Sequence, residues 1–164
     1  MQRQSLGRVG IGLTFLLSVA PSAVCVSAPA VKLPMAQIVR ARRAHFKELG
    51  RAMKALADQL RESHPDWSIV VRDSNRMTRL AGDLPGWFPV GSGPESGLTT
   101  RARASIWAEP TGFTHASQVL AARVRDLASA VSSRDRPLAH ARAVAVGRAC
   151  GSCHRQFRAH SSWW

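Results

Sequence analysis

Apolar residues recur at alternating steps of three and four along four segments of this chain, which is the pattern of helices that pack against other helices. The first segment runs from Val39 to Leu60, and Pro65 ends it because a proline ring restricts the preceding residue and cannot continue a helix. The second segment spans residues 67–84, and Asp66 is placed to cap its N-terminus.

Two further segments of the same kind follow a connection, residues 83–97, that is rich in proline and glycine and low in charge. One begins near Thr111 and runs to Val131. The other begins around Pro137, a residue suited to a first helical turn, and continues to Phe157. No alternation typical of β-strands competes with these patterns. We therefore expect an all-α fold, an antiparallel four-helix bundle with one longer central connection.

The N-terminal 30 residues have the features of a secretory signal peptide. Residues 1–10 contain two arginines and no acid, residues 11–20 are apolar, and small residues precede Ala30. A membrane anchor needs about 20 continuous apolar residues, and Pro21 interrupts this run too early. We expect cleavage after Ala30, which leaves residues 31–164 as one four-helix bundle domain in the periplasm without a stable membrane anchor.

The charge of the chain points to acidic partners. Removing a signal that holds two arginines and no acid lowers the formal net charge from +13 to +11. A strongly basic surface favours association with acidic molecules. We do not expect nucleic-acid binding, because the arginines are dispersed, no recognition motif accompanies them and the protein is predicted to be exported.

The C-terminal stretch AVGRACGSCHRQFR places Cys150, Cys153 and His154 in a C-x-x-C-H arrangement, whereas Cys25 leaves with the predicted signal. A disulfide across so short a helical span has a constrained geometry. A zinc site wants four ligands, and the other histidines form no second pair. Covalent haem uses both thiols for thioether bonds and the adjacent imidazole as iron ligand. The spacing favours haem, because all three side chains lie toward one side of the helix; a redox-active dithiol without haem is the alternative.

Three stretches, RRAHFKELGRAM, SIWAEPTGF and VGRACGSCHRQFR, together resemble cytochrome c prime and its class II c-type relatives over about residues 35–158. The resemblance implies a four-helix bundle with one haem c per chain, covalently attached near the C-terminal helix. It implies that Cys150 and Cys153 form the thioethers and that His154 is the axial iron ligand. Arg158, one turn later, matches the basic residue beside the proximal imidazole, or is a solvated arginine that favours the helix dipole.

Two residues of the first helix complete the predicted site. Arg42 lies on an otherwise apolar stripe, where a guanidinium needs an anion. The resemblance implies that this anion is a haem propionate. The alternatives are an ion pair with another helix, or a side chain whose flexible stem carries the guanidinium out to solvent. The resemblance places Phe46 over the distal face of the haem, and phenylalanine has no lone pair to donate, so we expect five-coordinate, high-spin iron. His45 is rotated by about 100° from the stripe and Met53 lies about 10 Å further on, so neither is an expected ligand.

These residues predict a periplasmic c-type cytochrome that binds nitric oxide and carbon monoxide, holds oxygen weakly, and takes part in single-electron transfer with an acidic redox partner. The alternative is a six-coordinate, low-spin class II cytochrome that acts purely as an electron carrier. An enzyme is not expected, because the sequence offers no Ser/His/Asp set and no distal acid-base group. The resemblance also implies a homodimer through the first two helices.

Overall fold

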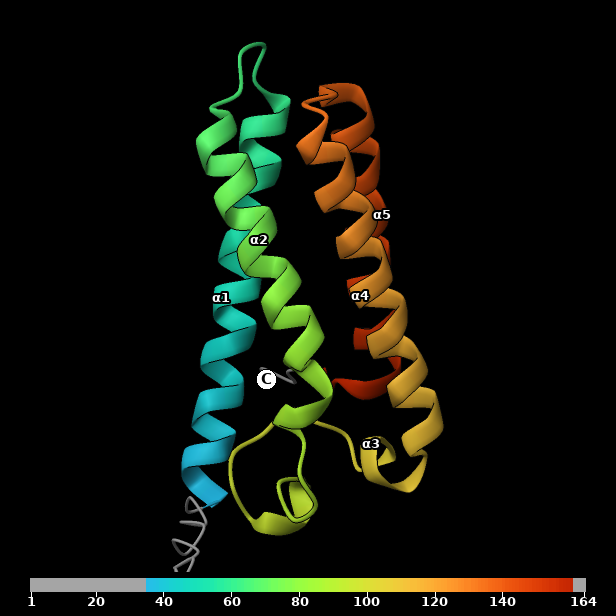
Figure 1. Cartoon of the computed structure of the whole chain (residues 1–164). Helices are drawn as coiled ribbons and strands as arrows, with labels where there is room; N and C mark the ends of the chain where they lie inside the picture. The colour runs from blue at the N-terminus through green and yellow to red at the C-terminus, as the bar shows by residue number, and fades with distance from the viewer. Residues whose placement is uncertain (1–34, 161–164) are drawn as a thin grey trace, which may run out of the picture. The chain divides into compact units, whose positions relative to one another are not determined.

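The structure is a computed structural model that describes residues 35–160. The predicted signal at residues 1–30 and the tail at 161–164 lie outside the described residues. Four long helices run along the bundle (Figure 1). They are α1 (Met35–Arg61), α2 (Trp67–Asp83), α4 (Pro110–Ser132) and α5 (Arg136–Phe157). Within this part of the chain, no helix is both long enough and apolar enough to cross a membrane.

Two of the predicted helix starts, those of α2 and α5, are confirmed by their caps. The carboxylate of Asp66 accepts a hydrogen bond from the backbone N–H of Ser68 at 2.8 Å and another from the hydroxyl of Ser68 at 2.6 Å. At the start of α5, Asp135 accepts from the backbone N–H of Leu138 at 2.9 Å, and Pro137 occupies the first turn. Each carboxylate satisfies an N–H group that has no partner inside its own helix.

The central connection is more structured than its proline and glycine content predicts. It contains the short 3₁₀ helices η1 (Leu84–Trp87) and η2 (Pro94–Ser96), followed by the four-residue helix α3 (Ser105–Ala108). Gly97 ends η2 with a φ of 69°, in the left-handed region that favours glycine. The connection is therefore a folded cap on the bundle.

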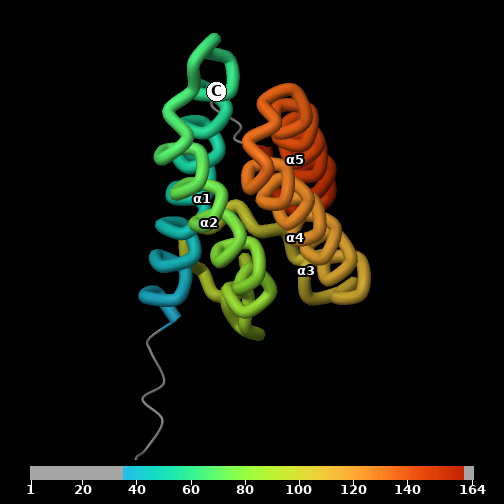
Figure 2. Tube along the Cα trace, turned by 45° about the horizontal axis from the view of Figure 1, so that its top comes forward, coloured from blue at the N-terminus to red at the C-terminus, as the bar shows by residue number. Residues whose placement is uncertain are grey.

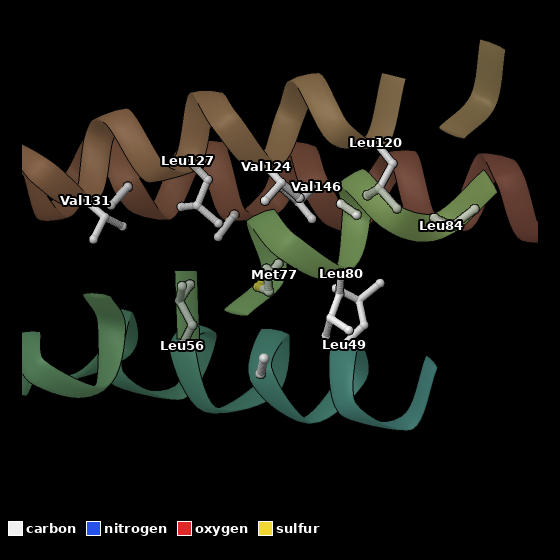
Figure 3. Close-up of a cluster of buried hydrophobic side chains, with 14 of the residues drawn as sticks. Leu49, Leu56, Met77, Leu80, Leu84, Leu120, Val124, Leu127, Val131 and Val146 are labelled. Atoms are coloured by element: carbon white, nitrogen blue, oxygen red, sulfur yellow. The ribbon is translucent and has the colours of Figure 1, made fainter. Parts of the chain in front are cut away.

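The helices form two antiparallel pairs, α1 with α2 and α4 with α5, and the pairs join mainly through α2 and α4 (Figures 1 and 2). Apolar side chains from all four long helices converge between the pairs, and Figure 3 shows this core. Its members include Leu49, Leu56, Met77, Leu80, Leu120, Val124, Leu127, Val131 and Val146. The four predicted stripes are the faces that pack together, which confirms the four-helix bundle.

A short β-bridge ties the central connection to the end of α5. The backbone N–H of Arg103 donates to the carbonyl of Phe157 at 3.0 Å, and the N–H of Ala159 donates to the carbonyl of Arg101 at 2.8 Å. Ala102 and Arg158 form the bridge pair between them. The pairing holds residues 101–103 against the end of the helix that carries the C-x-x-C-H motif.

Candidate functional site

The two cysteines of the motif are free thiols on the inner side of α5. Cys150 and Cys153 are half-buried and pack against the apolar core. Burial raises the pKa of the Cys150 thiol, and burial together with the neighbouring Cys150 raises the pKa of Cys153 to about 11. Both side chains are therefore neutral thiols at ordinary pH.

His154 follows in the last turn of α5, with its side chain more exposed than the two thiols. The loss of water on its protein-facing side lowers the pKa of His154, and the positive charges of Arg158 and Arg101 lower it further. These effects favour the neutral imidazole, which is the form that binds a metal.

Arg158 caps the C-terminus of α5, where its backbone N–H donates to the carbonyl of His154 at 3.1 Å. Burial and the charge of Arg101 lower the pKa of its guanidinium. Arg101 reaches this end of the helix through the β-bridge, and its Nε donates to the carbonyl of Ala159 at 3.1 Å. Arg101 was not predicted from the sequence, because the pairing that brings it here leaves no local pattern.

Arg42 is buried, with 3% of its surface exposed. Its Nη1 donates to the hydroxyl of Ser92 at 2.9 Å, and its Nη2 donates to the carbonyl of Ser92 at 2.8 Å and to the hydroxyl of Thr100 at 2.9 Å. Desolvation lowers the pKa of the guanidinium, and the charge of Glu95 partly offsets this. Among the described residues, no carboxylate lies within ion-pair distance of Arg42. The hydrogen bonds of this buried cation therefore go to neutral groups.

The side chain of Phe46, on α1, is half-buried and contacts the rings of Trp87 and Phe88 in the central connection. A row of ring contacts runs from it to the attachment helix: Phe46 meets Phe88 at 6.1 Å between centroids, Phe88 meets Phe113 at 4.8 Å, and Phe113 meets Phe157 at 5.4 Å. Phe157 is one turn after Cys153 on α5. An apolar, aromatic layer therefore links the predicted distal residue to the helix of the two thiols.

The two neighbours that the sequence analysis set aside as ligands lie in packed surroundings. His45 stacks on the ring of Trp87, with centroids 4.8 Å apart and planes at 25°. It is half-buried, because the ring of Trp87 covers it. Met53 is also half-buried and packs against the apolar core further along α1.

The residues present fit a covalently attached haem. Two free thiols with the required spacing lie beside an imidazole that is kept neutral. Arg42 is a buried cation without an acidic partner among the described residues, which suits a propionate. The aromatic layer that includes Phe46 offers an apolar surface for a porphyrin face.

Comparison with known proteins gives the family of this chain. The family described as "Cytochrome C'" matches residues 37–158. The cytochrome c prime of Rhodospirillum rubrum is 28% identical over 125 residues, which cover 76% of this chain and 83% of that protein. The crystal structure of cytochrome c prime from Thermochromatium tepidum shares the fold with a TM-score of 0.72 at 18% identity, covering 78% of this chain and 98% of the other. A nitric oxide complex of a cytochrome c prime variant from Alcaligenes xylosoxidans gives a TM-score of 0.70 at 18% identity, with coverages of 77% and 97%. Because the family match spans the four helices and the C-x-x-C-H motif, the chain belongs to the cytochrome c prime family.

Proposed function

We propose that this protein is a periplasmic c-type cytochrome with one covalently attached haem c, whose five-coordinate, high-spin iron binds nitric oxide and carbon monoxide and takes part in single-electron transfer. The observation that carries the proposal is the group at the end of α5, where the free thiols of Cys150 and Cys153 lie beside His154, whose pKa is lowered by burial and by Arg158 and Arg101. In this proposal the working domain is residues 31–164, released from its signal peptide, and it is not an enzyme.

Each residue of the motif has one task. Cys150 and Cys153 hold the porphyrin by thioether bonds, which suits neutral thiols that face apolar surroundings. His154 would supply a nitrogen ligand to the iron, and burial together with the nearby arginines lowers the pKa of this imidazole, which disfavours a proton that would compete for that nitrogen. Arg158 would keep a positive charge beside His154, on the side of the haem that this imidazole binds. The bound haem supplies a redox-active iron with a position for a diatomic ligand.

Arg42 is proposed to bind a haem propionate. Its guanidinium is buried, its hydrogen bonds go to the neutral Ser92 and Thr100, and a propionate would bring the negative charge that these partners lack. Ser92 and Thr100 then act as positioning residues, because they fix the direction of the guanidinium.

Phe46 is proposed as the distal apolar lid. Its ring carries no hydrogen-bond donor and no lone pair, so it excludes water and leaves the sixth position to small neutral ligands. Oxygen is bound weakly at such a site because no donor stabilises it, whereas nitric oxide and carbon monoxide need less help. A cytochrome c prime variant that shares this fold forms a nitric oxide complex, which supports nitric oxide as a ligand.

The first experiment is to express the full precursor in a host with a haem-attachment system and to record visible spectra, oxidised and reduced, with and without carbon monoxide. Broad, unsplit reduced bands that sharpen with carbon monoxide are expected. Sharp, split bands indifferent to carbon monoxide would instead indicate the six-coordinate electron carrier. N-terminal sequencing of the same protein tests cleavage after Ala30, and size-exclusion chromatography tests the proposed homodimer.

The proposed attachment is tested on single residues. Replacing both Cys150 and Cys153 by serine is expected to remove the mass of covalent haem from the protein. His154→Ala is expected to change the spectrum, whereas His140→Ala, at an exposed position on the same helix, is not. Covalent haem in the double serine variant would contradict the assignment of the thiols.

A further inference from the structure

A groove of about 580 Å³ runs along the surface between α4 and α5. Its floor is made of short apolar side chains, among them Ala116, Val119, Ala145 and Ala149. Short side chains let the backbone of another molecule approach closely. Cys153 forms part of the same wall, so the groove reaches the proposed haem attachment.

The rim of the groove is strongly basic. Arg123, Arg142 and Arg148 line it, and their side chains are exposed. Among the described residues that line the groove, none is acidic. Arg123 makes a long ion pair with Asp126 at 3.4 Å, whereas α5 itself contains no acidic residue that would neutralise the other two. Arg142 and Arg148 are therefore guanidinium groups with donors available beside an apolar floor.

The shape and charge of the groove favour some kinds of binding partner over others. A second copy of this chain is a poor occupant of this groove, because α5 contains no acidic residue to pair with the arginine rim and the proposed homodimer uses the first two helices instead. A bilayer surface is flat and would not fill a hollow recessed between two helices. Single-stranded nucleic acid is bound by stacking its bases on aromatic side chains, and no Phe or Trp lines the groove among the described residues. Duplex nucleic acid is not expected, because the protein is predicted to be exported and carries no recognition motif. A protein segment that carries carboxylates matches both the apolar floor and the arginine rim, because a guanidinium binds a carboxylate through two parallel hydrogen bonds.

We infer that the α4–α5 groove is the docking site for an acidic segment of a partner protein, with Arg142 and Arg148 binding its carboxylates. The inference rests on the proposed function, since the partner is the redox protein that single-electron transfer requires. Docking in this groove places the segment against Cys153, beside the proposed haem attachment.

The test uses a fluorescein-labelled octaglutamate peptide and the purified holoprotein at low ionic strength, with binding followed by fluorescence anisotropy. The groove variant is Arg142→Gln with Arg148→Gln. Its matched control is Arg40→Gln with Arg43→Gln, which removes the same charge from exposed arginines of α1. The groove variant is expected to bind about tenfold more weakly or worse, from the loss of charge-assisted hydrogen bonds. The control is expected to lose about threefold or less, from the change in net charge alone.

A second readout locates the peptide without any substitution. Phenylglyoxal modifies accessible arginines, and mass spectrometry of the wild-type protein shows which ones the peptide protects. Protection of Arg142 and Arg148 in preference to Arg40 and Arg43 is expected. Equal loss of affinity in both variants, or equal protection of both pairs, overturns the inference. So does groove-dependent binding to phosphatidylglycerol vesicles without groove-dependent peptide binding, because the occupant is then a membrane.

The same preparations separate this inference from the proposed function. Protein mass and visible spectra report haem attachment independently of peptide binding. A chain without covalent haem that still binds the peptide through the groove supports the docking site and contradicts the proposed function. A normal haem spectrum without groove-dependent peptide binding supports the proposed function and contradicts the docking site.

Discussion

The guanidinium of Arg42 donates a hydrogen bond of 2.8 Å to the backbone carbonyl of Ser92, fifty residues further along the chain. A second bond of 2.9 Å reaches the hydroxyl of the same serine, which is fully buried. The guanidinium also lies over the ring of Phe88, with 4.6 Å to the centroid. These contacts fix the central connection against α1, so Arg42 has a structural task besides its proposed role toward a propionate.

Replacing Arg42 by leucine removes all of these hydrogen bonds. The buried carbonyl and hydroxyl of Ser92 lose their partner, and so does the hydroxyl of Thr100. The free energy of unfolding is expected to fall by about 2–4 kcal/mol, because buried polar groups without partners are costly. Guanidinium chloride unfolding followed by circular dichroism measures this. Arg43→Leu, at the exposed neighbouring position, is expected to change stability by less than about 0.5 kcal/mol. Similar losses in both variants would show that the Ser92 bonds contribute little.

Gly93 is required by the close approach of the Glu95 carboxylate and the Trp107 ring. A methyl group added at Gly93 would lie 2.7 Å from a ring carbon of Trp107, whose Nε1 donates to the carbonyls of Phe88 and Pro89 at 3.1 Å each. Gly93→Ala is expected to displace the indole and to cost about 1–3 kcal/mol, as overpacking does. Thermal unfolding and tryptophan fluorescence measure both effects. Gly86→Ala is the control, because an added methyl there meets nothing within 4 Å. An unchanged melting temperature for Gly93→Ala would mean that the connection adapts freely.

The helices could be predicted from the sequence because their signals are local. A stripe of apolar residues at helical spacing predicts which face of the helix is buried. Asp66 and Pro137 each indicate where a helix begins. The C-x-x-C-H motif is local too, so its three residues were found together. Their roles came from the motif and the resemblance, and they stay predictions until haem attachment is measured.

The rest of the site depends on contacts between distant parts of the chain. Ser92 and Thr100 hold Arg42 only because the connection folds back onto α1, and Arg101 reaches His154 only through the bridge between Ala102 and Arg158. None of these residues belongs to a periodic pattern or a motif. The acid-free lining of the α4–α5 groove likewise follows from the pairing of two helices, which spacing within one helix does not reveal.

The N-cap of α2 makes stability depend on acidic pH. Hydrogen bonds from the hydroxyl and the backbone N–H of Ser68 lower the pKa of Asp66. Because the folded pKa lies below the unfolded one, the ionised carboxylate contributes stability at higher pH, and this contribution is lost as the pH falls through the folded pKa. Melting temperatures between about pH 2 and pH 6 are therefore expected to converge for the wild type and Asp66→Asn at the acid end. Asp83→Asn is the control for the loss of one surface carboxylate, because Asp83 makes no side-chain cap bond to η1. A difference between wild type and Asp66→Asn that does not change with pH would exclude a titrating cap.

Phe46→Met tests the proposed distal lid directly. Phe46 is half-buried against the rings of Trp87 and Phe88, and methionine is flexible enough to occupy that space while offering a sulfur lone pair. If Phe46 lies over the iron, the variant is expected to show sharp, split reduced bands and to lose most of its response to carbon monoxide, because the thioether takes the sixth position. Leu49→Met, at a buried position of the same stripe, is the control and should keep the wild-type spectrum. Broad bands that still respond to carbon monoxide in Phe46→Met would place another residue over the iron and would remove the basis for the proposed gas selectivity.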